Sequence, residues 1–169
     1  MESVLQKLQR AIAAGIDGMT TQEMGRHREG KWSTAQVLEH LSLTYIGTIK
    51  GFERCIEAGK PLATVPTLKG RLSVLVVTGL GYLPEGRKAP VNTEPRGIPA
   101  ETIRGSIGPQ IAAMDELIGR CELRYGKATH LLDHPILGPL TGAEWRKFHY
   151  IHGKHHLKQI NRLREMPTL

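Results

Sequence analysis

The sequence has few aromatic residues, few cysteines and no long apolar run, and each shortage argues against a class of protein. Aromatic residues make up 5% of the 169 residues, which argues against a nucleic-acid surface built on base stacking. The two cysteines, Cys55 and Cys121, lie inside predicted helices and form no spaced framework. We therefore expect small core thiols in a reducing cytoplasm and not a disulfide-linked secreted domain.

No segment is predicted to enter or cross a membrane. The longest uncharged run, Leu72 to Pro84, contains two glycines and is shorter than the ~20 residues that span a bilayer. The first residues lead directly into a polar amphipathic helix, so no secretory signal is predicted. We expect a cytoplasmic protein without a membrane partner.

Acidic residues are the minority, and the formal net charge is +7. The basic residues are spread along the chain, and charge alone indicates only solubility and non-specific association. A nucleic-acid partner is therefore not favoured. The hydrophobic share of 40% and the length predict a single domain over residues 1–169 with a sizeable core.

Apolar residues spaced by threes and fours predict four amphipathic helices. They cover residues 2–16, 33–58 and 100–123, and a fourth starts at Thr141. Ser33 with Gln36, and Thr141 with Glu144, form two capping boxes. The fold class predicted is all-α, a four-helix bundle. Residues 59–99 contain six prolines and predict a long crossover, so that the second and third helices run parallel in an up-down-down-up arrangement. No strand is predicted, and residues 72–78 are interpreted as an extra helical turn.

The fourth helix carries four of the eight histidines within residues 149–156. His152 and His156 are four residues apart, so they share one helix face. That face continues the apolar stripe of Trp145 and Phe148, and Gln159 lies on it too. Unpartnered buried imidazoles would cost roughly 1–3 kcal/mol each. A shared metal ion would satisfy them. His149 and His155 are expected to be solvated.

The second helix supplies a third imidazole. His40 flanks the apolar stripe next to Leu41 and can lean inward. Three nitrogen ligands and an open fourth position are typical of a catalytic zinc-type site. Nickel is equally compatible with His40, His152 and His156, and iron or cobalt could also bind them. Gln159 and Glu39 are candidates to hold the outer ring nitrogens, although Glu39 could equally face water.

Other candidate residues have ordinary interpretations. His27 is expected on the surface, and His130 and His134 in loops or as capping residues. Cys55 and Cys121 are expected in the core as inert thiols. A basic face of the fourth helix is expected to be solvated, with an anionic thiol cofactor as the alternative ligand. Its residues are Lys147, Lys154, Lys158 and Arg162.

Two motifs, Trp32-Ser33…Leu38-Glu39-His40-Leu41 and His152-x-x-x-His156-x-x-Gln159, resemble the DinB/YfiT-like superfamily of metal-binding four-helix bundles. Residues 134–145, from His134-Pro135 to Glu144-Trp145, are similar to a branch of bacterial proteins of unknown function. The resemblance implies an up-down-down-up bundle and a divalent metal on His40, His152 and His156. Characterised members of that superfamily include transferases and an isomerase that use low-molecular-weight thiols such as mycothiol and bacillithiol, whereas this branch carries no such assignment.

The first functional hypothesis is a divalent-metal-dependent enzyme, in particular an S-transferase that uses a low-molecular-weight thiol and a small-molecule substrate. The cation would keep a bound thiol or water ionised near neutral pH. The alternative is a non-catalytic metal-binding or structural bundle that acts through dimerisation. A DNA-binding protein would instead need a contiguous basic groove and salt-dependent binding.

Overall fold

A computed structural model describes residues 2–66, 74–79 and 88–166. Over these residues the chain is mainly helical, with five α-helices and a small two-stranded sheet. The elements, in chain order, are α1 (Val4–Ile16), α2 (Thr21–Gly25), α3 (Thr34–Glu57), the π-helical turn η1 (Leu75–Gly79), the 3-10 turn η2 (Val91–Thr93), α5 (Ala100–Tyr125), β1 (His130–His134), β2 (Gly138–Thr141) and α6 (Gly142–Arg164).

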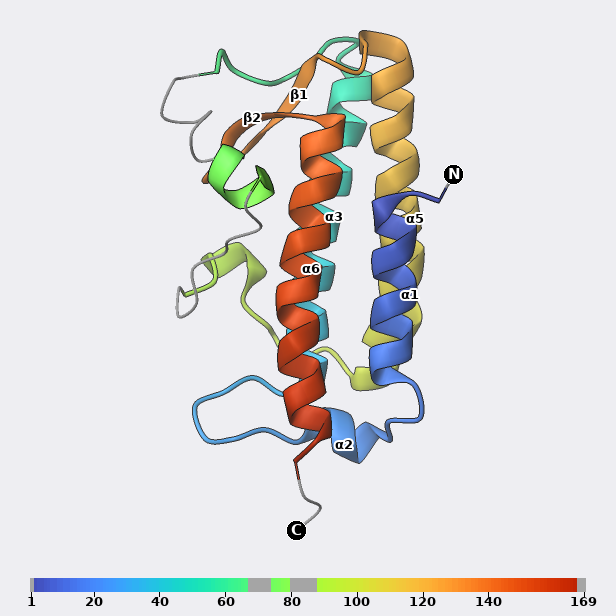
Figure 1. Ribbon diagram of the computed structural model, residues 1–169, viewed down its shortest axis with the longest axis vertical. Coiled ribbons are helices and arrows are strands. Elements are labelled where there is room, and N and C mark those ends of the chain that lie inside the picture. The colour runs from blue at the N-terminus through green and yellow to red at the C-terminus, as the bar shows by residue number, and fades with distance from the viewer. Residues whose placement is uncertain (1, 67–73, 80–87, 167–169) are drawn as a thin grey trace.

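The four long helices α1, α3, α5 and α6 lie side by side along the long axis of the molecule (Figure 1). Each of α1 and α3 packs against both α5 and α6. In Figure 1, α3 and α5 run in one direction and α1 and α6 in the other. The predicted mainly helical character is therefore confirmed, and the parallel course of α3 and α5 follows from the long connection between them.

The helix starts lie where the capping signals predicted them. Ser33 accepts a hydrogen bond from the backbone N–H of Gln36, and Thr141 accepts one from that of Glu144. Both capping boxes are complete. The short helix α2 was not predicted, although Thr20 and Glu23 form the same kind of box. Its five residues are too few for a helical period to be read from the sequence.

The core runs through the middle of the helix assembly. Apolar residues of α1, α3, α5 and α6 form one buried cluster together with residues of the sheet. Cys55 and Cys121 are fully buried within it and unbonded to each other, as predicted. Burial raises the pKa of both thiols, that of Cys121 to about 11, so neither is a nucleophile near neutral pH.

The sequence prediction that no strand is present was wrong. Strands β1 and β2 pair antiparallel, with Leu132 opposite Leu140 and His134 opposite Gly138. Leu132 packs so closely on α3 that a Cβ at Gly51 would come 2.3 Å from its side chain. The strands are short and contain Pro139. Proline and glycine indicated a loop, whereas packing onto α3 selects the extended conformation.

The connection between α3 and α5 is described only in part. Residues 75–79 form the helical turn η1, in agreement with the predicted helical turn. Leu72 and Ser73 of that prediction lie outside the described residues. None of the helices in the described ranges combines the length and apolar character that a membrane crossing requires.

Helices α1 and α6 approach each other at glycines. A Cβ at Gly153 of α6 would lie 2.6 Å and 2.7 Å from the two methyl carbons of Leu8, and a Cβ at Gly15 would lie 2.5 Å from Leu157. Leu8 is completely buried, so its side chain has little room to turn away. Because Gly153 has no side chain, the middle of α6 can lie this close to α1.

This close approach predicts opposite effects for one substitution at two helical glycines. We expect Gly153→Ala to lower the free energy of unfolding by about 1–3 kcal/mol, because overpacking outweighs the gain in helix propensity. Gly47→Ala is the matched control: it lies on α3, is exposed and has no atom near the added methyl group. It should raise stability by about 0.5–1 kcal/mol. Urea unfolding of the metal-free proteins measures both, and equal stabilisation by the two variants would contradict the packing argument.

Candidate metal centre

Three histidines from two helices converge inside the helix assembly. His40 comes from α3, and His152 and His156 come from successive turns of α6. The Nε2 atom of His152 lies 3.2 Å from Nε2 of His40 and 3.1 Å from Nε2 of His156. One ligand atom from each of the three residues lies within 4.8 Å of the other two. The structure thus brings together the three residues that the sequence predicted as a site.

A backbone carbonyl fixes the tautomer of His40. Its Nδ1–H donates to the carbonyl oxygen of Thr93 over 2.8 Å. Because a carbonyl can only accept, the proton of the neutral ring must be on Nδ1. The lone pair on Nε2 therefore points toward the other two histidines. Thr93 belongs to η2, 53 residues away along the chain, and no pattern in the sequence predicts this partner.

Gln159 performs the same task for His156. The Nδ1–H of His156 donates to Oε1 of Gln159 over 2.9 Å, so its Nε2 also presents a lone pair to the common point. Gln159 lies one turn further along α6, where the sequence placed it as an outer partner. Its amide nitrogen faces Nε2 of His155 at 3.4 Å, which orients the amide so that its oxygen faces His156.

The geometry and the donor set fit a cation. Two nitrogens bound at about 2.0–2.1 Å to one tetrahedral ion lie about 3.3–3.4 Å apart. Two of the three spacings, 3.1 Å and 3.2 Å, are close to that value, and all three ligand atoms lie within 4.8 Å of one another. His152 lies between two lone pairs and can donate one Nε2–H at most. Its buried Nδ1 has no hydrogen-bond partner among the described residues. A cation shared by the three Nε2 atoms would satisfy these three lone pairs, with the proton of His152 on its Nδ1.

Desolvation keeps the three imidazoles neutral at pH 7. Burial and the neighbouring His40 together lower the pKa of His156 to about 4, although its hydrogen bond to Gln159 acts in the opposite direction. Burial also lowers the pKa of His40, although its hydrogen bond to Thr93 acts in the opposite direction. Loss of hydration and the surrounding imidazoles lower the pKa of His152 well below its ordinary value. Neutral imidazole is the form that binds a metal, so the site is ready to bind near neutral pH.

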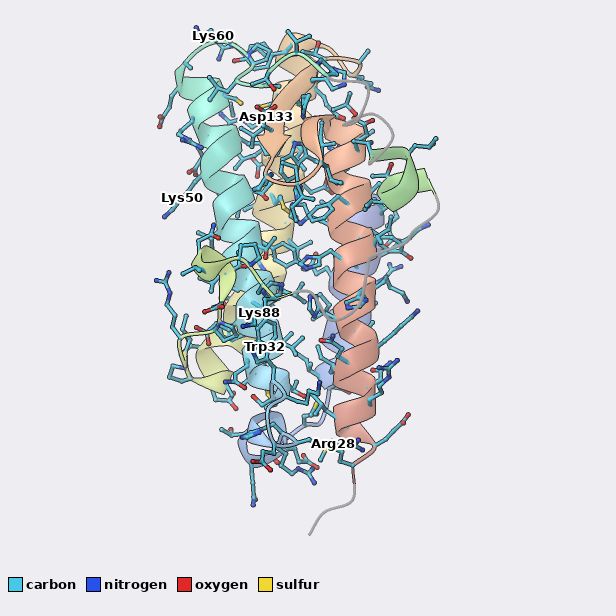
Figure 2. The ribbon with its side chains drawn as sticks, turned by 90° about the vertical axis from the view of Figure 1, so that its left-hand side faces the viewer. Arg28, Trp32, Lys50, Lys60, Lys88 and Asp133 are labelled. Carbon is cyan, nitrogen blue, oxygen red and sulfur yellow. The ribbon has the colours of Figure 1, made fainter. Side chains whose placement is uncertain are left out.

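Aromatic rings border the centre on two sides. The Trp32 ring lies 5.1 Å from the ring of His40, and Phe148 stacks on His152 at 5.5 Å. Figure 2 shows the side of the molecule between α3 and α6, where Trp32 is labelled. His40 and His156 are buried, whereas His152 is half-buried. Of the three ligands, His152 is therefore the most exposed, and its ring lies against the ring of Phe148.

Glu39 does not face water and is not an outer partner of the metal ligands. Its carboxylate is 1% exposed and accepts hydrogen bonds from the backbone N–H groups of Arg96, Gly97 and Ile98. Both predictions for Glu39, as an outer partner of a ring nitrogen or as a side chain that faces water, were therefore wrong. Helical spacing locates a side chain on a helix face, but it carries no information about a loop that packs there.

The expectation that His149 is solvated was also wrong. His149 is completely buried, stacks on Trp145 and lies 3.0 Å, through Nε2, from the hydroxyl of Thr48. The spacing 145, 149, 152, 156 is itself a helical stripe, so this signal was present in the sequence. The buried face of α6 is wide because α1, α3, η1 and β2 all contact it. His155 is half-buried, not fully solvated.

The remaining predicted residues take ordinary roles. His134 lies in β1, and its Nδ1 accepts hydrogen bonds from the backbone N–H groups of Ile136 and Leu137, which makes it a capping residue of the turn. His130 lies in the same strand, and His27 is exposed. The predicted solvated face of α6 is exposed at each of its basic residues, Lys147, Lys154, Lys158 and Arg162.

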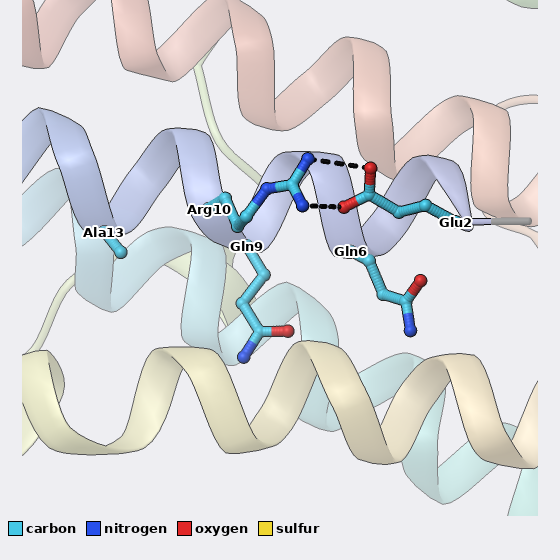
Figure 3. A pocket seen from close by; sticks show the side chains of 5 residues that line it. All are labelled: Glu2, Gln6, Gln9, Arg10 and Ala13. Atoms are coloured by element: carbon cyan, nitrogen blue, oxygen red, sulfur yellow. Dashed lines mark hydrogen bonds and ion pairs between the residues drawn. The ribbon is translucent and has the colours of Figure 1, made fainter.

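An open pocket on α1 lies apart from the histidines. Side chains of α1 and of Glu2, which precedes α1, line it. An ion pair of 2.5 Å joins Arg10 to Glu2 (Figure 3). The lining residues are Glu2, Gln6, Gln9, Arg10 and Ala13. Exposed ion pairs of this kind contribute only about 0–1 kcal/mol. The pocket offers no group with unusual chemistry, so the histidine centre is the candidate functional site.

The buried neutral His149 predicts acid sensitivity of the metal-free protein. Burial lowers its pKa to about 3, so the unfolded chain binds the proton that the folded chain excludes. The contribution of neutral His149 to the free energy of unfolding is therefore fully present above pH 6.5 and decreases as the pH falls toward 3. Between pH 6 and pH 4, wild type should lose about 1.4 kcal/mol per pH unit more than His149→Phe. Urea unfolding at several pH values measures this. His27→Gln is the control and should follow wild type, and parallel curves for wild type and His149→Phe would contradict the assignment.

Comparison with known proteins assigns a family but no activity. No curated protein and no solved structure matches the chain. The resemblance to the DinB/YfiT-like superfamily was wrong as an identification, because the family model that matches is a different one. The match covers residues 5–163, and the chain belongs to the family described as protein of unknown function (DUF1569).

Proposed function

We propose that this protein binds a divalent transition-metal ion through the Nε2 atoms of His40, His152 and His156 and uses the ion in catalysis. The observation that carries the proposal is the pair of hydrogen bonds from Nδ1 of His40 and His156 to oxygen acceptors. These bonds direct two imidazole lone pairs at a third imidazole. Outer partners of this kind are typical of metal-bound histidines.

The ligand set favours a catalytic over a structural ion. Among the described residues, three histidines and no fourth side chain gather at the centre, and structural zinc sites have four protein ligands. A cation bound there would lower the pKa of a thiol or water in its remaining position and supply a nucleophile near pH 7. Zinc and nickel suit three imidazoles best, and iron or cobalt could bind them.

The protein's own residues would hold and shield the reacting groups. His40 and His156 keep their orientation through Thr93 and Gln159. The ring faces of Trp32 and Phe148 lie beside the ligands and would exclude water from an apolar part of a small-molecule substrate. S-transfer from a low-molecular-weight thiol would use this arrangement, with the thiol as metal ligand. That reaction stays a prediction to be tested by a thiol-transfer assay.

The setting of the site is part of the proposal. We propose that α1, α3, α5 and α6 constitute a four-helix bundle in the up-down-down-up arrangement, within one domain over residues 1–169. The contacts of α1 and α3 with both other helices support it. Helix pairs could then supply ligands from facing sides of the core. A homodimer is compatible with this arrangement, and size-exclusion chromatography with light scattering would test it.

Metal content is the direct test of the proposed function. Untagged protein, purified without a nickel column, should bind about one zinc or nickel ion per chain. His156→Ala removes a ligand, so its affinity should fall by more than the roughly 10–100-fold that loss of an outer partner costs. Isothermal titration calorimetry and elemental analysis measure both quantities.

The matched control for this experiment is His27→Ala, which removes an exposed histidine far along the chain from the centre. It should bind metal like wild type. Equal affinity in wild type, His27→Ala and His156→Ala would show that binding is surface chelation, and the proposed function would be wrong.

The lowered pKa values predict how metal affinity depends on pH. Protons compete with a cation for imidazole lone pairs, and the pKa of His156 is about 4. Affinity should therefore change little between pH 8 and pH 6 and fall as the pH approaches 4. Competition with a metal indicator over this range measures it. A decline centred near 6.5, the value of a solvated imidazole, would contradict a desolvated site.

A further inference from the structure

The segment of residues 88–99, here called the strap, runs past the metal centre and is exposed over most of its length. Thr93 is its one buried residue. The strap has one short 3-10 turn, η2, and little other internal structure. Its position must therefore be set by contacts with the rest of the protein.

Two adjacent residues of α3 hold the strap. His40 donates through Nδ1–H to the carbonyl of Thr93. Glu39 accepts hydrogen bonds from the backbone N–H groups of Arg96, Gly97 and Ile98 at 2.6, 3.0 and 3.1 Å. Gly97 has φ +90°, a conformation that favours glycine and lets three consecutive N–H groups turn toward one carboxylate.

Glu39 is unusual among the buried groups of this protein. Its carboxylate is 1% exposed, and none of the ion pairs of the described chain includes it. Burial of a charge is costly unless hydrogen bonds compensate it. Here three backbone donors do so, and charge-assisted bonds are the strong ones. These three hydrogen bonds therefore hold the strap firmly on α3, close to Thr93, whose carbonyl orients His40.

We propose that Glu39 is a positioning residue of the metal centre, which holds the strap so that the Thr93 carbonyl meets Nδ1–H of His40. The inference rests on the proposed function. A cation on Nε2 makes the Nδ1–H of the same ring a better donor. Metal binding therefore tightens the strap, and by reciprocity a held strap tightens metal binding.

The test uses the full chain and Co²⁺ as the probe ion. Glu39→Gln keeps the size of the side chain but replaces one acceptor with an N–H donor that faces backbone N–H groups. Gly97→Ala disturbs the strap from its own side. Nothing lies within 4 Å of the added methyl group, so only backbone strain acts. Glu53→Gln is the matched control, an exposed carboxylate on the same helix.

Two measurements separate positioning from general stability. Co²⁺ affinity and the visible spectrum of the bound ion report on the ligand geometry. The rate of trypsin cleavage after the exposed Arg96 reports on release of the strap. We expect Glu39→Gln and Gly97→Ala to bind Co²⁺ about 10–100-fold more weakly, with a shifted spectrum and faster cleavage. In wild type and Glu53→Gln, Co²⁺ should slow cleavage.

The outcomes are distinguishable. Wild-type affinity and spectrum in a folded Glu39→Gln variant overturn the inference and leave the metal site standing. If Glu39→Gln does not fold, Gly97→Ala decides by the same criteria. Cleavage of the wild type at the same rate with and without bound Co²⁺ overturns the coupling. No Co²⁺ binding by the wild type overturns the proposed function itself.

Discussion

The structure depends on a hydrogen bond between an imidazole of α3 and a carbonyl in the long connection from α3 to α5. The bond from His40 to Thr93 sets a tautomer, satisfies a buried ring nitrogen and anchors an exposed segment at its one buried residue. The bond matters for stability because a buried polar atom without a hydrogen-bond partner costs about 1–3 kcal/mol. Its counterpart on α6, the bond from His156 to Gln159, completes the orientation of the centre.

The sequence predicted those features that adjacent residues encode. Capping boxes located the starts of α3 and α6, and helical periodicity gave the four long helices and the His152–His156 pair. His40 needed only the assumption that a histidine beside an apolar stripe turns inward. Each of these predictions uses interactions within one or two helical turns, where backbone geometry leaves few alternatives.

Features that depend on distant partners were missed. Glu39 and Thr93 owe their roles to hydrogen bonds between α3 and the strap, whose partners are more than 50 residues apart along the chain. Strands β1 and β2 owe theirs to packing on α3 and α6. The prediction that His149 is solvated was wrong because the buried face of α6 is wider than the stripe through His152 and His156. The family resemblance was wrong as an identification, because a different family model matches the chain.

The two helices that carry the ligands come from opposite parts of the chain, and 112 residues separate His40 from His152. Contacts that close so long a loop carry an entropic cost. The complete ligand set therefore exists only once α3 and α6 have docked. A metal ion that binds this set stabilises the finished fold by mass action and does little to guide its early steps.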